Sequence, residues 1–254
     1  MANIVIHNFD SIDVIQINRK SGKGNALNTD TLEELRNSLR EIKQNDEANG
    51  LILTGTGNFF SSGLDLNELA NLLPSEIKNY LNLSSSVFLE LFGLSIPTIA
   101  AINGHAVAGG AVLACACDFR LFMKGNFKFG FTGVNLGIPY PLIPLEIIKF
   151  AIPSYSYSEI LLEGKLIDPE TALQKNIVQI LIDSSSDIIE EAITYMKDNI
   201  KAPRKNYKFL KDNLRKPIID YIKKIKDEYD KNLFEKFLSN DLNNILNEKL
   251  HKYK

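Results

Sequence analysis

Cysteine, long apolar runs and phosphate-binding motifs are scarce or missing in this sequence. Its two cysteines, Cys115 and Cys117, lie beside alanines with one residue between them, which fits neither a disulfide framework nor a zinc-binding CxxC pair and predicts buried thiols. The longest apolar stretch, residues 96–116, is interrupted by Pro97, Asn103 and His105, whereas a membrane span needs roughly 18 apolar residues. We therefore expect no metal site and no membrane partner.

A strong excess of charge is absent as well. The net charge is -2, the isoelectric point is about 6.0, and 24% of the residues are charged. Neither GxGxxG nor GxxxxGK[ST] occurs, which disfavours binding of a nucleotide phosphate. Residues 201–254 are rich in lysine, but acidic residues are interleaved with the lysines, a pattern typical of a solvated helix face. We expect no nucleic-acid partner.

The first residues, MANIVIHNFDSIDVIQI, lack the basic segment and the cleavage motif of a signal peptide. Their β-branched residues instead predict two short strands around a turn at Asp10–Ser11. We interpret this segment as the start of the fold and expect a cytoplasmic location.

Strands and helices alternate along the rest of the core. A helix begins at Asn28, and the buried strand NGLILTGTG leads through a tight loop into a helix in NFFSSGLDLNELANLL. A strand at residues 97–102, a turn at GHAVA, an apolar helix at GGAVLACAC and a strand at DFRLFM follow. The segment FKFGFTGVNLGIPYP has too much glycine and proline for a regular helix and predicts a shaped loop. A helix entered through Asp168–Pro169 then runs into a strand, and everything after Asp187 has a helical pattern.

The C-terminal residues carry an apolar stripe at helical spacing, which must cover either the core domain or a neighbouring subunit. Its members are Ile222, Ile225, Tyr229, Leu233, Phe234 and Phe237. We expect a core domain at residues 1–195 and a C-terminal helical region at residues 196–254 that is involved in oligomerisation.

Two segments combine a buried strand, a glycine-bearing turn and a helix start. They are FFSSGLDL after the strand LILTG, and GHAVAGG after the strand TIAAI. Glycine lets the backbone approach a ligand closely, and the first N–H groups of a helix have no partner within the helix. Two such turns on adjacent strands can direct two N–H groups at one oxygen atom, which is the physical form of an oxyanion hole.

These turns, in this order and at this separation, resemble those of the crotonase superfamily, also called the enoyl-CoA hydratase/isomerase family. The resemblance covers most of the chain through four segments: RKSGKGNALNTDTLEEL, LILTGTGNFFSSGLDLNEL, IPTIAAINGHAVAGGAVLACACDFRL and EILLEGKLIDPETALQKNIV. It implies an α/β fold, a crotonase-like spiral of repeated β-β-α units with a C-terminal helical region. It also implies a homotrimer or a dimer of trimers.

The resemblance assigns the two oxyanion donors to the backbone N–H groups of Leu64 and Gly109. They would hold the thioester carbonyl oxygen of an acyl-CoA or acyl-carrier-protein substrate as it becomes an enolate. Coenzyme A or phosphopantetheine would then enter as part of the substrate, and no separate cofactor is expected. Residues around the donors and in the following loop are expected to bind substrate: Gly63, Asp65, Leu66, Gly110, Val112, Thr132 and Gly133.

The usual acid and base of the family are missing. Hydratases of the family place one glutamate where this chain has Val112 and a second where it has Gly133. Other members use an acid near the end of the same loop, where this chain has Pro139, Tyr140 and Pro141. Tyr140, between two prolines, is the expected catalytic proton donor. Glu68 is an alternative, as a displaced acid, and His105 is interpreted as structural.

We expect isomerase or lyase chemistry on the thioester enolate and not simple hydration, because a missing acid or base removes about 10²–10⁴ in rate. One alternative is a decarboxylase of the polyketide β-branching type, which this chain resembles at Val112 and in FGFT, residues 129–132. Tyr229 stands where such enzymes have a histidine, and Lys78 could reach the substrate carboxylate. The other alternative is a non-catalytic thioester-binding or scaffold protein.

Overall fold

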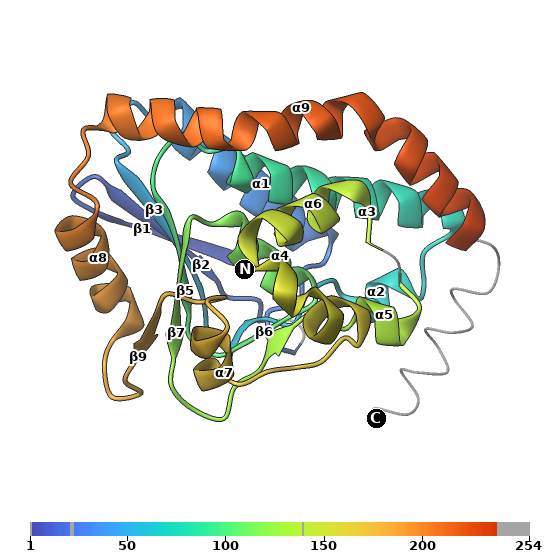
Figure 1. The fold of residues 1–254 in the computed structure, drawn as a ribbon, viewed down its shortest axis with the longest axis horizontal. Helices are drawn as coiled ribbons and strands as arrows, with labels where there is room; N and C mark the ends of the chain where they lie inside the picture. Colours follow the sequence, from blue (N-terminus) through green and yellow to red (C-terminus); the bar gives the residue numbers. More distant parts are fainter. Residues whose placement is uncertain (1, 21–22, 139, 238–254) are drawn as a thin grey trace.

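Two β-sheets organise the protein (Figure 1). The computed structural model describes residues 2–20, 23–138 and 140–237. Within this part, the large sheet contains, in sheet order, β1 (Ile4–Phe9), β2 (Ile12–Ile17), β3 (Gly50–Gly55), β5 (Thr98–Ile102), β7 (Phe119–Met123) and β9 (Ile180–Ile182). The small sheet contains β4 (Phe59–Ser61), β6 (His105–Val107) and β8 (Phe129–Gly130). β1 and β2 pair antiparallel, as the predicted hairpin requires, and the other neighbours pair parallel.

Repetition of one unit produces this arrangement. In each repeat the first strand joins the large sheet, the second joins the small sheet, and a helix follows. The repeats are β3–β4 with α2 (Leu66–Leu69) and α3 (Pro74–Phe92), β5–β6 with α4 (Gly109–Ala116), and β7–β8 with α5 (Gly133–Leu136). The predicted spiral of β-β-α units is therefore confirmed.

Three local predictions were wrong. The tight loop predicted after β3 contains the strand β4. GHAVA is not only a turn, because residues 105–107 form β6 and pair with β4 and β8. The segment predicted as a loop holds β8 and α5, and α6 (Leu142–Ala151) begins directly after it. The short ladder of the small sheet supplies backbone hydrogen bonds that stabilise these three-residue and two-residue strands.

Helices cover both faces of the large sheet. On one face, side chains such as Val14, Ile52 and Ile99 pack against α8 (Ile188–Asn199). On the other face, a larger core packs against α1 (Thr29–Gln44), α3 and α4 (Figure 1). The predicted start of α1 is confirmed, because the Asn28 side chain accepts a hydrogen bond from the Thr31 N–H and caps the helix.

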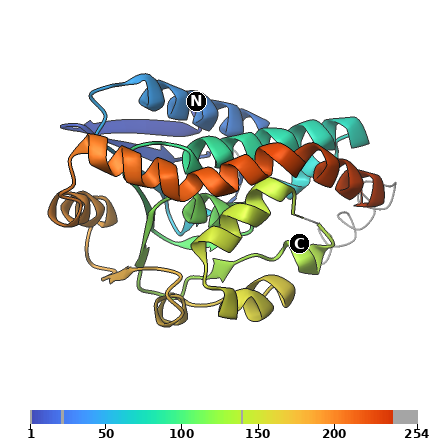
Figure 2. The same ribbon diagram turned by 45° about the horizontal axis from the view of Figure 1, so that its top comes forward.

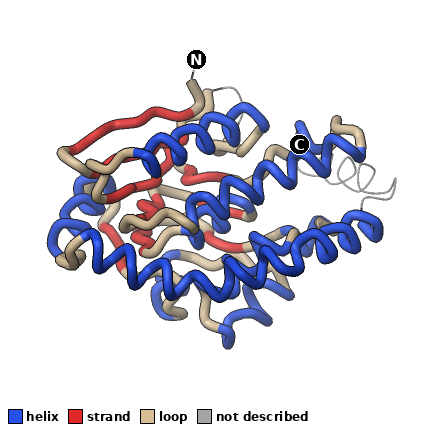
Figure 3. Tube along the Cα trace, turned by 90° about the horizontal axis from the view of Figure 1, so that it is seen from above, coloured by secondary structure: helices blue, strands red, loops and turns tan. Residues whose placement is uncertain are grey.

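The last described helix, α9 (Arg204–Phe237), runs along the length of the molecule, outside α3 and α6 (Figure 2). Viewed from above, strands are visible beside and between the long helices (Figure 3). Ile222, Leu233 and Phe234 are buried in the main core, and Ile225 and Tyr229 pack partly buried against it. The stripe thus covers the core of its own chain.

The division into a core domain and a C-terminal region stays a prediction. The expected boundary after residue 195 falls inside α8, whose Met196 is buried against the large sheet. The connection between α8 and α9 spans residues 200–203. Three parts of the sequence predictions lie outside the described residues: Pro139, the side chain of Phe237, and the C-terminal region from residue 238 to 254.

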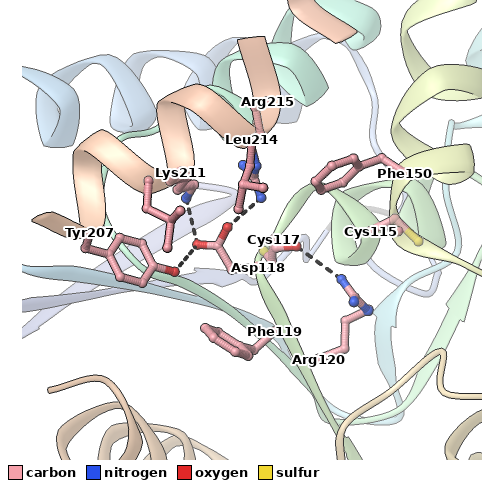
Figure 4. A pocket seen from close by; sticks show the side chains of 12 residues that line it. Cys115, Cys117, Asp118, Phe119, Arg120, Phe150, Tyr207, Lys211, Leu214 and Arg215 are labelled. Carbon is pink, nitrogen blue, oxygen red and sulfur yellow. Dashed lines mark hydrogen bonds and ion pairs between the residues drawn. The ribbon is translucent and has the colours of Figure 1, made fainter. Parts of the chain in front are cut away.

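A buried charge cluster anchors the first half of α9 to β5 and β7 (Figure 4). The Asp118 carboxylate accepts hydrogen bonds from Lys211 Nζ at 2.7 Å, Arg215 Nη2 at 2.5 Å and the Tyr207 hydroxyl at 3.0 Å. The side chains of Asp118, Lys211 and Arg215 are only 12%, 6% and 4% exposed. The Arg215 guanidinium also stacks 4.1 Å from the centre of the Phe92 ring.

A cavity of about 340 Å³ adjoins this cluster. Arg120 in its wall already donates hydrogen bonds to the carbonyl oxygens of Cys117 and Ile177. Cys115 and Cys117 also line the cavity; both are free and buried, as predicted, and burial raises their pKa to about 11 and about 12. Each of the charged groups here has its partners within the fold, so the cluster acts as a structural anchor.

Candidate active site

Two backbone turns meet at the ends of β4 and β6. Gly63 has a φ of +89°, and Ala108, just before α4, has a φ of 50°. A Cβ atom built on Gly63 would lie 2.7 Å from the Gly109 nitrogen, so the two turns are in direct contact. The backbone N–H groups of Leu64 and Gly109 donate no hydrogen bond to the rest of the described chain. Both are therefore available to a ligand.

The first turn is fixed from several sides. Leu27 N–H donates to the Gly63 carbonyl at 2.8 Å, and the buried Tyr80 hydroxyl accepts from Asp65 N–H at 3.0 Å while donating to the Leu27 carbonyl. Arg19 pairs with the Asp65 carboxylate at 2.6 Å, with both side chains 10% exposed. This network holds the Leu64 N–H in place before any ligand binds.

An apolar cavity of about 100 Å³ opens between these turns and the segment after β8. Its lining includes seven of the residues predicted from the sequence: Leu64, Leu66, Gly109, Val112, Thr132, Gly133 and Tyr140. Among the other lining residues are six that no sequence pattern singled out individually: Leu81, Ser84, Phe88, Leu136, Ile138 and Pro144. Both oxyanion candidates thus face one cavity with a largely aliphatic wall.

Three predicted site residues do not line this cavity. Gly63 shapes the first turn through its positive φ. Asp65 caps α2 by accepting hydrogen bonds from the N–H groups of Asn67 and Glu68. Gly110 leaves room for Ser61, because a Cβ atom on it would lie 2.1 Å from the Ser61 carbonyl oxygen.

Tyr140 is the one residue with a titratable side chain in the described lining. Burial raises the pKa of its phenol to about 12, although the hydrogen bond from Gly133 N–H works in the opposite direction. The hydroxyl is therefore protonated at neutral pH. Three other described side chains in the same wall carry a hydroxyl: Ser62, Ser84 and Thr132. These aliphatic hydroxyls do not titrate near neutral pH.

The other candidate acids and bases are engaged elsewhere. His105 Nδ1 accepts a hydrogen bond from Lys128 N–H at 3.1 Å, and its ring packs between Phe59 and Phe127. Burial, followed by the charge of Lys128, lowers the pKa of His105. The Glu68 carboxylate binds the N–H and hydroxyl of Thr29 at the start of α1. Both side chains have structural roles in this fold.

The two groups considered for a substrate carboxylate lie away from the lining. Lys78 is exposed, with its Nζ 5.8 Å from the centre of the Phe234 ring. The Tyr229 hydroxyl donates to the backbone carbonyl of Tyr140 at 3.5 Å. Tyr229 therefore supports the segment that carries Tyr140.

Comparison with known proteins identifies the class. The family model for enoyl-CoA hydratase/isomerase matches residues 8–254. The chain belongs to the enoyl-CoA hydratase/isomerase family, the crotonase superfamily predicted from its turns. The solved human mitochondrial delta3-delta2-enoyl-CoA isomerase shares the fold, with a TM-score of 0.91 at 24% identity over 99% of this chain and 98% of that chain.

Relatives with assigned names include both hydratases and isomerases. The chain is 30% identical to a short-chain-enoyl-CoA hydratase of Clostridium acetobutylicum over 72% of this chain and 70% of the relative. It is 37% identical to a crotonyl-CoA hydratase of Syntrophomonas wolfei over 54% of this chain and 52% of the relative. It is 31% identical to human enoyl-CoA delta isomerase 1 over 61% of this chain and 52% of the relative. The matched part thus spans about half the length of the last two relatives.

Location and assembly stay predictions. Across the residues that the structure describes, no helix is long and apolar enough to cross a membrane. Similar proteins include a probable mitochondrial enoyl-CoA hydratase of Arabidopsis thaliana, 32% identical over 70% of this chain and 60% of the relative. No group of metal-binding side chains occurs among the described residues.

Proposed function

We propose that this chain binds an acyl-CoA or acyl-carrier-protein thioester in the apolar cavity and stabilises its enolate, performing lyase or isomerase chemistry and not simple hydration. The observation that supports this is the pair of unused N–H groups, of Leu64 and Gly109, at one cavity whose described lining contains no carboxylate. A preorganised N–H donor typically contributes about 3 kcal/mol to stabilising the developing oxyanion.

The protonation state of Tyr140 in the cavity wall favours a reaction that needs no base. A neutral phenol with a pKa of about 12 cannot activate water or remove a carbon-bound proton at neutral pH. Decarboxylation forms the enolate without a base: the bond from carbon to carboxylate breaks, carbon dioxide leaves, and the electron pair moves toward the thioester oxygen. That oxygen would lie against the Leu64 and Gly109 N–H groups. Among lyase reactions we therefore favour decarboxylation of a carboxyacyl thioester.

Double-bond isomerisation is the second candidate. The similarity to human enoyl-CoA delta isomerase 1, at 31% identity, supports it. An isomerase must remove a proton from one carbon and return it to another. This reaction would therefore require Tyr140 to act first as the base and then as the acid. The remaining alternative is binding of a thioester without turnover.

A thioester panel tests these candidates. The protein is incubated in D2O with 2-enoyl, 3-enoyl, 3-methylglutaconyl and malonyl-type thioesters on CoA and on carrier protein, and the products are analysed by mass spectrometry. Loss of carbon dioxide with one deuterium gained supports the decarboxylase, and a migrated double bond supports the isomerase. Binding without any change in mass or structure across the panel would contradict both catalytic functions.

We propose a preference for short acyl groups. The cavity of about 100 Å³ is smaller than the roughly 300–1,000 Å³ typical of pockets for larger ligands. Leu136→Ala should enlarge it from the partly exposed helix α5, with little loss of core packing. We expect kcat/KM for an octanoyl-length substrate to rise about tenfold relative to a butanoyl-length one. Steady-state kinetics with both chain lengths measure this ratio.

Val134→Ala is the matched control, because Val134 lies on the same helix, is 45% exposed and is not part of this cavity's lining. Its ratio should equal that of the wild type. An unchanged ratio in Leu136→Ala would show that this side chain does not limit the length of the acyl group.

A further inference from the structure

The Tyr140 hydroxyl occupies the space into which a side chain at position 133 would extend. A Cβ atom built on Gly133 would lie 2.9 Å from the Tyr140 oxygen and 3.0 Å from both Tyr140 Cζ and the Ile138 carbonyl oxygen. Gly133 has no side chain, so the phenol can approach its backbone closely. The glycine and the tyrosine therefore form one unit in the cavity wall.

The hydrogen bonding of this unit leaves a proton unused. Gly133 N–H donates to the Tyr140 hydroxyl oxygen at 3.2 Å, so the phenol acts as an acceptor in this contact. No described residue accepts the proton of the Tyr140 hydroxyl. Because both residues line the same cavity as Leu64 and Gly109, that proton is available to a bound ligand.

The backbone beside Tyr140 is held from the other side by α9. The buried Asp230 carboxylate accepts a hydrogen bond from Leu142 N–H at 3.0 Å, and Tyr229 donates to the Tyr140 carbonyl. Pro141 restricts the backbone between these two contacts. The phenol is thus fixed at its hydroxyl by Gly133 and at its backbone by α9, which is the preorganisation that a proton donor requires.

We propose that Tyr140 is the catalytic acid that protonates the enolate carbon, an inference that rests on the proposed function. In this step the O–H bond of Tyr140 breaks and a C–H bond forms at the α-carbon. The electron pair of the enolate C=C bond forms the new C–H bond, and the thioester C=O bond re-forms beside Leu64 and Gly109. The Tyr140 phenolate then takes a proton from water, which completes the cycle.

Tyr140→Phe tests the donor directly, because it removes one oxygen atom and keeps the ring that packs in the wall. We expect kcat to fall about 10²–10⁴-fold on the thioester that the wild type converts. The Kd of an unreactive thioester analogue should change by less than a few fold. Tyr155→Phe is the matched control, since Tyr155 is 66% exposed and, in the described part of the chain, its hydroxyl bonds the Lys175 carbonyl and Asn176 alone. Its kcat should equal that of the wild type.

Gly133→Ala is a second variant that keeps the hydroxyl but displaces it, because the new Cβ would lie 2.9 Å from it. It should lower kcat as well. If Tyr140→Phe retains the wild-type kcat, the proton-donor role is wrong while the proposed function stands. If Tyr140→Phe loses analogue binding as strongly as kcat, Tyr140 is a binding residue and the proposal is also overturned. If the wild type converts no thioester, both proposals are overturned.

Discussion

Gly63→Ala is expected to lower thioester turnover about 10²–10³-fold, the loss typical of one displaced oxyanion donor. The φ of +89° at Gly63 is unfavourable for alanine, and the added Cβ would lie 2.7 Å from the Gly109 nitrogen and 2.9 Å from the Val107 carbonyl oxygen. The two turns must then separate, so the Leu64 and Gly109 N–H groups no longer converge on one oxygen. The measurement is kcat/KM on the substrate found in the thioester panel.

Gly57→Ala separates steric displacement from backbone strain. Gly57 has a similarly positive φ of +62°, but a Cβ atom there would meet nothing within 4 Å. This variant should lose some stability and keep its turnover. If Gly63→Ala folds and retains full turnover, the contact between the two turns is not an oxyanion hole.

Asp118→Asn is expected to lower the free energy of unfolding by about 3–5 kcal/mol, because removing one partner leaves the charges of Lys211 and Arg215 buried without a counter-ion. For a chain of this size, that loss corresponds to roughly 6–20 °C in Tm. Chemical denaturation followed by circular dichroism measures the first quantity, and calorimetry measures the second.

The pH dependence of this effect has a defined sign. Burial alone would raise the pKa of Asp118, but the charges of Lys211 and Arg215 outweigh it and hold the pKa below its ordinary value. A carboxyl with a lowered pKa in the folded state stabilises the fold above its unfolded pKa of about 4, and this contribution is lost as the pH falls through the folded pKa. The difference between wild type and Asp118→Asn should therefore shrink below about pH 4.

Asp183→Asn is the control for the anchor. Asp183 pairs with Lys124 at 2.7 Å, but its side chain is 70% exposed. Exposed pairs contribute about 0–1 kcal/mol, so this variant should unfold close to the wild type. Equal, small losses in Asp118→Asn and Asp183→Asn would show that the buried cluster does not anchor α9.

Much of the fold could be predicted because its signals are local. Asn28 caps α1 through its own side chain, and β3 and β5 are continuous apolar runs. β6 and β8 were missed because strands of two or three residues have no periodic pattern, and only pairing between distant segments defines them. The helix α6 was missed because it is apolar on most sides and contains Pro144.

The candidate site likewise contains some residues that the sequence could predict and others that it could not. The turns with Gly63 and Gly109 carry a recognisable glycine pattern, and the structure brings them into contact. Phe88 and Leu81 gave no such signal, because α3 reaches the cavity only through helix packing. The relation between Gly133 and Tyr140 also depends on the path of the chain, since seven positions separate them in sequence and one hydrogen bond joins them.

The anchor of α9 also determines the order in which the fold can be completed during synthesis. Lys211 binds the Ile96 carbonyl across 115 positions, and Arg215 binds Asp118 across 97 positions. At about 5–20 residues per second, the ribosome needs roughly 5–20 s to add those 97 residues after Asp118. During that interval the nascent sheet carries a carboxylate without its cations and an apolar core without its outer helix. Closure of the core is therefore a late event relative to formation of the sheet, because it must wait until α9 has been translated.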